Sequence, residues 1–252
     1  MRIVATYDWG LAWDYRSQFL HGALTALEVS AVALVLSVFV GLLLALARMS
    51  RPPLTWGAAV YVNVFRGMPA LVTVLWVYFG LSIFIGVNFT VFQAGVIALT
   101  LLYGAFISEI YRAALEAIPR GQREAGMALG LGKSRTFVQV ILPQATKIAI
   151  PNIGSMFIGM VKDTSVFTVI GLLEIVRVSQ QANSLYYQPF VFYSAAALFY
   201  VVIAFVLDFL FRVIERILTT PPRGRLARAA TARQRRRIEL VVQRVEAVSG
   251  AR

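Results

Sequence analysis

Few side chains in this chain of 252 residues can carry out chemistry. It has no cysteine and a single histidine, His21, which excludes thiolate metal sites, most histidine metal sites and nearly all Ser-His or Cys-His catalysis. Three ionisable side chains remain inside long apolar stretches: Glu109, Lys162 and Asp163. Ionisable groups in such stretches are costly in a membrane and are candidates for function by default. A carboxylate there can bind a cationic group of a solute, and Lys162 or Thr164 can bind an anionic one.

Each of these residues also has a structural interpretation. Lys162 and Asp163 are adjacent, so on a helix their side chains point about 100° apart and do not simply neutralise each other. Asp163 lies about 22 Å along its apolar segment and Glu109 lies near the end of another, which argues against both touching one solute. An ion pair that joins two helices is the alternative role for either carboxylate. Asp208 and Arg212, four residues apart, are expected to form a structural pair.

The elements that position these residues are strongly apolar. Hydrophobic residues make up 59% of the chain and charged residues 14%, against about 45–50% and about 25% in soluble domains. The mean hydropathy is +0.73. Five stretches reach the roughly 20 apolar residues that a membrane helix needs, namely 24–47, 68–86, 92–114, 148–170 and 190–211. The sequence therefore predicts an all-α integral membrane protein with five transmembrane helices.

The basic residues predict its orientation. With the N-terminus outside, twenty of the 24 Lys and Arg residues belong to segments on the inner side of the membrane and three to segments on the outer side. The remaining one, Lys162, lies within the fourth predicted helix. Because positive charge marks the cytoplasmic side, the N-terminus is expected outside and the C-terminus inside. The predicted organisation is an extracytoplasmic segment 1–23, a transmembrane domain 24–215 and a basic cytoplasmic tail 216–252. Such a tail is attracted to anionic lipid at about 1 kcal/mol per cation, and nucleic-acid binding is the less favoured role.

The segment 117–143, between the third and fourth predicted spans, has the pattern of a helix-turn-helix. Pro119 can open a first helix and Gly130 can end it. Ser134 is suited to cap a second, short helix, which Pro143 should stop. The tight glycine turn predicts a knob that fits a groove on a partner, rather than a helix that rests on lipid.

The same segment contains Gly132-Lys133-Ser134, which resembles the end of a phosphate-binding P-loop. The first glycine of that motif would have to stand where the chain has Met127, and no predicted strand precedes it. We therefore expect no nucleotide and no other cofactor on this chain. If ATP and Mg²⁺ are used, another polypeptide holds them.

The segment resembles the EAA loop of ABC-importer permeases, whose pattern is E-A-A-x₃-G-x₉-I-x-L-P. The matching positions are Glu124, Ala125, Gly126, Gly130, Val140, Leu142 and Pro143, with glycine for the second alanine and valine for isoleucine. Four further motifs are similar to those of the polar amino acid branch of this family: F-R-G-M-P at 65–69, E-I-Y-R at 109–112, I-P-R-G-Q at 118–122 and K-D-T-S at 162–165. The resemblance extends over about residues 22–215.

The resemblance implies a type I ABC importer fold and a permease subunit that is not itself an enzyme. Such a subunit translocates polar L-amino acids into the cytoplasm across the inner membrane of a bacterium. The implied partners are a cytoplasmic ABC ATPase dimer that docks on the segment 117–143, and a periplasmic or tethered amino acid-binding protein. A second permease chain, identical or homologous, is implied as well. It is also expected on physical grounds, since five helices with few inward polar groups cannot enclose a path alone.

The solute is less specified than the class of transporter. The segment 61–66 and Arg177 look most like the glutamate/aspartate branch. Under this resemblance the ammonium of an amino acid would meet Asp163, and its carboxylate would meet Lys162 or Thr164. Two other functions stay open: an ion or solute channel not coupled to an ATPase, and a receptor that does not transport. An intramembrane enzyme would need a nucleophile-base pair or a metal cluster, and the single histidine, His21, supplies neither.

Overall fold

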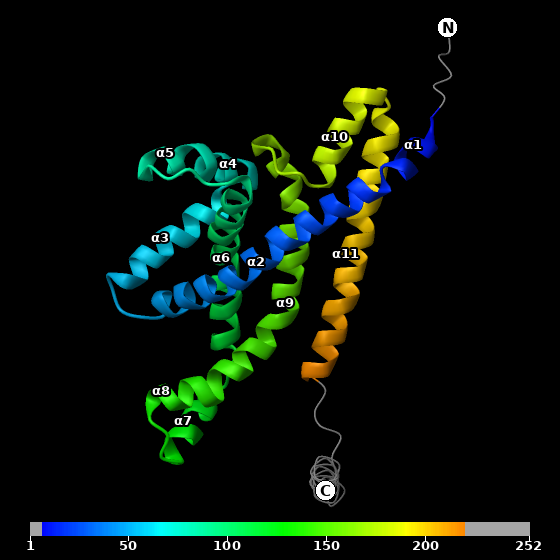
Figure 1. Ribbon diagram of the computed structural model, residues 1–252. Coiled ribbons are helices and arrows are strands. Elements are labelled where there is room, and N and C mark those ends of the chain that lie inside the picture. Colours follow the sequence, from blue (N-terminus) through cyan, green and yellow to red (C-terminus); the bar gives the residue numbers. More distant parts are fainter. Residues whose placement is uncertain (1–6, 220–252) are drawn as a thin grey trace, which may run out of the picture. The chain divides into compact units, whose positions relative to one another are not determined.

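The computed structural model describes residues 7–219, and within that range all regular structure is helical (Figure 1). By its internal contacts the chain divides into two units, Met1–Arg212 and Val213–Arg252. The first unit holds every element discussed below, except that the last helix, Pro189–Thr219, continues past Arg212. The predicted tail 216–252 lies almost entirely outside the described residues.

Four helices are long and apolar enough to cross a membrane. They are α2 (Arg16–Arg48), α6 (Val91–Glu116), the continuous helical stretch Lys133–Ile170 and α11 (Pro189–Thr219). A bent helix pair raises the number of candidate spans to five. The structure thus confirms the predicted all-helical membrane fold and places apolar helices at all five predicted stretches.

The second predicted span, 68–86, is not one straight helix. Helix α3 (Leu54–Gly67) is followed by the segment Ala70–Ile85, and the two meet at an angle of 111°. That segment comprises α4 (Ala70–Leu75), a π-helical turn η1 (Trp76–Leu81) and α5 (Ser82–Ile85). The bend has a local cause, because a residue before proline is forced away from helical geometry. Met68, which precedes Pro69, is extended with φ −88° and ψ 135°.

The prediction that Pro143 stops a short helix is wrong. Helix α8 (Lys133–Thr136) passes through a π-helical turn, η2 (Phe137–Ile141), into α9 (Leu142–Asp163), and a 3₁₀ helix, η3 (Thr164–Ile170), follows. Pro143 lies in the first turn of α9, directly after the π turn. The π turn adapts the backbone here, since the Leu142 amide donates to the Phe137 carbonyl five residues back. Helix α8 is capped by Gly132 and not by Ser134.

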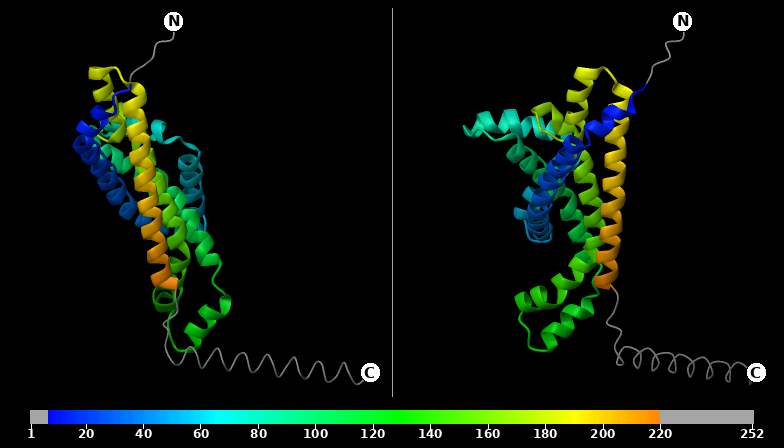
Figure 2. Two further views of the ribbon diagram at one scale, coloured as in Figure 1. Left: turned by 90° about the vertical axis from the view of Figure 1, so that its right-hand side faces the viewer. Right: turned by 45° about the vertical axis from the view of Figure 1, so that its right-hand side comes forward.

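Helix α2 crosses α6 and α9 obliquely (Figure 1) and packs against both. The α2 face that is buried carries mostly small residues, which lets the helices approach closely: Gly22, Ala23, Ala26, Ser30, Ala33, Ser37, Gly41 and Ala45. Helix α10 (Ile175–Tyr186) and α1 (Trp9–Asp14) lie at one end of the first unit. Helix α7 (Arg120–Ala128) and α8 lie at the opposite end (Figure 2).

Candidate functional site

A cavity of about 280 Å³ opens between the start of α4, α6 and α9. Asp163 is the one ionisable carboxylate among its lining residues, which include no lysine, arginine or histidine. The complete lining is Met68, Ala70, Leu102, Tyr103, Phe106, Ser155, Met156, Gly159 and Asp163. The cavity is therefore apolar over most of its surface and negatively charged at one point.

Asp163 is the last residue of α9, and Tyr103 of α6 contacts it across the cavity wall. The Tyr103 hydroxyl donates a hydrogen bond to Asp163 Oδ2 at 3.0 Å. The tyrosine is 6% exposed and the aspartate is half-buried. No cation of the described residues forms an ion pair with this carboxylate. The structure therefore shows Asp163 at a cavity wall, hydrogen-bonded to a tyrosine and outside the ion pairs of the described residues.

Lys162 and Thr164 do not share this cavity. Lys162 lines a different groove, of about 430 Å³, between α9 and α11, together with Tyr200 and Asp208. The two neighbours thus face different sides of α9, as their 100° separation on a helix predicts. The Thr164 side chain is fully buried, and its hydroxyl donates to the Val161 carbonyl at 2.7 Å.

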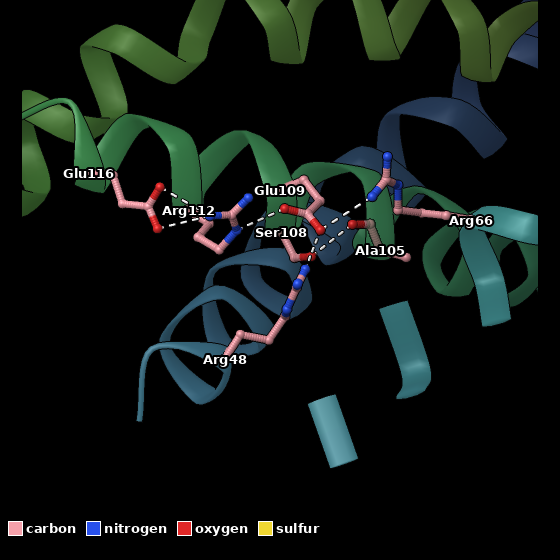
Figure 3. Close-up of polar contacts among 7 residues, drawn as sticks. All are labelled: Arg48, Arg66, Ala105, Ser108, Glu109, Arg112 and Glu116. Atoms are coloured by element: carbon pink, nitrogen blue, oxygen red, sulfur yellow. Dashed lines mark hydrogen bonds and ion pairs between the residues drawn. The ribbon is translucent and has the colours of Figure 1, made fainter. Parts of the chain in front are cut away.

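Glu109 lies at the centre of a charged cluster that joins the ends of α2, α3 and α6 (Figure 3). Its carboxylate pairs with Arg48, with Arg66 at 3.2 Å and with Arg112 at 2.8 Å. Arg112 pairs in turn with Glu116, also at 2.8 Å. Both carboxylate oxygens of Glu109 are thus paired with arginines. Glu109 is not among the residues that line the cavity at Asp163.

The expected pair of Asp208 and Arg212 is confirmed, with 2.8 Å between Arg212 Nε and Asp208 Oδ2.

Reasoning from the sequence missed Glu174, which is 0% exposed and caps the N-terminus of α10. It accepts hydrogen bonds from the amides of Val176 at 2.7 Å and Arg177 at 2.8 Å, and from the Tyr200 hydroxyl at 2.8 Å. Burial raises the pKa of Glu174 above its ordinary range, although these three hydrogen bonds oppose the shift. A carboxylate just before an amphipathic helix is a capping signal, but its burial depends on Tyr200, which is distant in sequence.

The predicted turn at Gly130 is confirmed. Gly130 has φ +82°, a left-handed conformation that suits glycine. The Gly130 amide donates to the Met127 carbonyl and the Leu131 amide donates to the Gly126 carbonyl, which together form a Schellman motif at the end of α7. Leu129, at the tip of this turn, is 82% exposed.

Gly126 departs from the EAA pattern for a steric reason. It is buried against Thr136 of α8, and a Cβ at position 126 would lie 2.6 Å from the Thr136 methyl carbon. The other matched positions divide between two helices. Glu124 and Ala125 are exposed on α7, whereas Leu142 and Pro143 form the first turn of α9.

The comparisons with known proteins agree with one another. Residues 37–220 match the family described as binding-protein-dependent transport system inner membrane component. The arginine ABC transporter permease protein ArtQ of Haemophilus influenzae is 33% identical over 84% of this chain and 98% of its own length. The glutamine transport system permease protein GlnP of Escherichia coli K12 is 36% identical over 83% of this chain and 97% of its own length.

A solved structure shares the fold over almost its whole length. The crystal structure of an amino acid ABC transporter with histidines superposes with a TM-score of 0.76 at 34% identity, and the match covers 84% of this chain and 99% of that one. The expected type I importer fold and the expected non-catalytic permease role are thereby confirmed. The chain belongs to the family of binding-protein-dependent transport system inner membrane components, the permease subunits of ABC importers.

Proposed function

We propose that this chain is the permease subunit of an ATP-driven amino acid importer, and that the cavity at Asp163 holds the solute on its way across the membrane. The observation that carries the proposal is the Asp163 carboxylate, which faces a cavity of about 280 Å³ whose described lining contains no lysine, arginine or histidine. An unpaired carboxylate among apolar helices is costly unless a cation balances it. The ammonium group of an amino acid is such a cation.

The charge of the lining also bears on the kind of amino acid. The cavity offers one anionic group and no cationic group that would balance a second carboxylate. Lys162, which was expected to help with a carboxylate, lines the other groove. We therefore favour neutral or cationic amino acids over the glutamate or aspartate suggested by the segment 61–66. The relatives named for arginine and glutamine transport support the same preference.

The ATPase dimer is proposed to dock on α7, at one end of the first unit. Leu129 projects from a turn that a Schellman motif makes rigid, which gives a partner a defined apolar knob. Beside α7 lies a hollow of about 440 Å³, lined in part by Arg120, Arg123 and Glu124. We propose that ATP and Mg²⁺ bind to that partner.

The remaining assignments follow from the family. The orientation is proposed with the N-terminus outside and the C-terminus inside the inner membrane of a bacterium. A second permease chain completes the pathway, and a periplasmic or tethered binding protein delivers the solute. A channel without an ATPase stays the alternative, and uptake by proteoliposomes that continues without ATP would favour it.

The substitution Asp163→Asn tests the solute site because it keeps the side-chain shape and removes the charge. We expect an assembled complex with normal basal ATPase activity and reduced uptake of radiolabelled amino acid in proteoliposomes. Asp208→Asn is the control, since that carboxylate is paired with Arg212. Normal uptake by the Asp163 variant, or a complex that dissociates on size exclusion, would contradict the assignment.

A further inference from the structure

We propose that Tyr103 is a positioning residue for the solute: its hydroxyl holds one oxygen of Asp163, so that the other oxygen faces the cavity and meets the solute's ammonium group. This inference rests on the proposed role of Asp163 and adds a second residue to it.

The geometry of the contact supports this role. The Tyr103 hydroxyl donates to Oδ2 of Asp163 at 3.0 Å, and both residues line the same cavity. The tyrosine ring is almost fully buried on α6, so its hydroxyl is delivered by a fixed element from sixty residues away in the sequence. A carboxylate with one oxygen fixed loses less conformational freedom when it binds a cation through the other.

The hydroxyl also gives the aspartate a polar partner within the cavity lining. Hydrogen bonds to an ionised group are stronger than neutral ones, and they fix the geometry of the acceptor more firmly. Because the rest of the lining is largely apolar, Tyr103 is the described lining residue that donates to this carboxylate.

Gly159 supplies the room for this contact. It stands one helical turn before Asp163 on α9 and also lines the cavity. A Cβ at position 159 would lie 2.9 Å from the Tyr103 hydroxyl oxygen, but 3.6 Å and 3.7 Å from the nearest ring carbons. A side chain at this position would thus displace the hydroxyl and leave the ring in ordinary contact. A glycine at residue 159 is therefore needed to make room for the hydroxyl of Tyr103. A phenylalanine ring at residue 103 would not need that room.

The test measures solute binding to the purified permease–ATPase complex without the binding protein, so that binding to the permease is seen directly. The probes are radiolabelled L-arginine and L-glutamine, and the variants are compared on the probe that the wild type binds more tightly. Tyr103→Phe keeps the ring and removes only the donor. We expect it to weaken binding about tenfold, as the loss of a hydrogen bond to a charged group implies.

Two double variants separate positioning from mere packing. In an Asp163→Asn background Tyr103→Phe should weaken binding no further, because the oxygen that it positions no longer carries a charge. Gly159→Ala should weaken binding in the wild type, and should add nothing to Tyr103→Phe, because the atom it would displace is gone. A packing role would give the same loss in every background.

The outcomes distinguish the positioning role of Tyr103 from the proposed solute site at Asp163. If Asp163→Asn weakens binding and Tyr103→Phe does not, the positioning role is wrong and the solute site stands. If Asp163→Asn binds as the wild type does, or if the wild type binds neither probe, the proposed solute site itself is wrong. If Tyr103→Phe does not assemble, Gly159→Ala decides the question, and normal binding by that variant would overturn the inference.

Discussion

Replacing Glu109 by glutamine would keep the shape of the side chain and remove the charge at the centre of the arginine cluster. Glu109 and Arg48 are each only 20% exposed, whereas Arg66 is 43% exposed. Removing one partner of a buried pair costs about 3–5 kcal/mol, and exposed pairs contribute about 0–1 kcal/mol. The exposure of this cluster lies between that of a buried pair and that of an exposed pair. Glu109→Gln should therefore lower the free energy of unfolding by about 2–3 kcal/mol.

The assay is thermal unfolding of the purified complex in detergent. A loss of that size corresponds to a fall in melting temperature of about 5–10 °C for a chain of this length. Glu116→Gln is the matched control, because Glu116 is 54% exposed and Arg112 is its one ion-pair partner among the described residues. It should shift the melting temperature by less than about 3 °C. Adding Arg48→Met to Glu109→Gln should recover much of the loss, because Arg48 is the least exposed of the three arginines that lose Glu109 as a partner.

Two results would refute this reasoning. If Glu109→Gln and Glu116→Gln have the same melting temperature, the ion pairs of Glu109 do not stabilise the packing of α2, α3 and α6. If Glu109→Gln melts normally but no longer binds solute, the carboxylate acts on the solute after all.

Three further predictions concern α7 and α10. Gly126→Ala, which restores the family alanine, should cost about 1–3 kcal/mol by overpacking against Thr136, and Thr136→Ala should recover it in melting experiments; equal melting of all three chains would contradict the contact. Gly130→Val should leave membrane insertion normal and abolish both ATPase stimulation and uptake, whereas Gly130→Asn should be milder because asparagine tolerates a positive φ; unchanged uptake with valine would remove the docking assignment. Because the raised pKa of Glu174 makes the folded state bind this proton more tightly than the unfolded chain, stability from this group is greatest below the ordinary glutamate range and falls as pH rises through the raised pKa. Glu174→Gln should flatten that slope in melting temperatures measured from the ordinary glutamate pKa upward, and an unchanged slope would contradict it.

The sequence predicts well what depends on composition and short-range pattern. The five apolar stretches, the Schellman turn at Gly130 and the pair of Asp208 and Arg212 follow from helix length, from glycine geometry and from a spacing of four. That Lys162 and Asp163 line different cavities follows from their separation of about 100° on a helix. Each of these rests on neighbours in the chain.

What the sequence does not predict depends on the backbone path or on distant partners. Pro69 bends a span whereas Pro143 is accommodated in one, and the difference lies in the π turn that precedes the second proline. Tyr103 meets Asp163, and Tyr200 meets Glu174, only once α6, α9, α10 and α11 are assembled. No local pattern marks either tyrosine.

The bend at Pro69 has a consequence for water. The first helical hydrogen bond of α4 runs from the Thr73 amide to the Pro69 carbonyl at 3.0 Å, so the amides of Ala70, Leu71 and Val72 have no acceptor within their own helix. Ala70 lines the cavity of about 280 Å³, which can hold several water molecules at about 30 Å³ each. Of these three donors, Ala70 belongs to the lining, and its amide favours water in the cavity. If the cavity holds the solute as proposed, a charged solute exchanges bulk water there for a partly wet chamber rather than for hydrocarbon, and the desolvation that would otherwise oppose its passage is reduced.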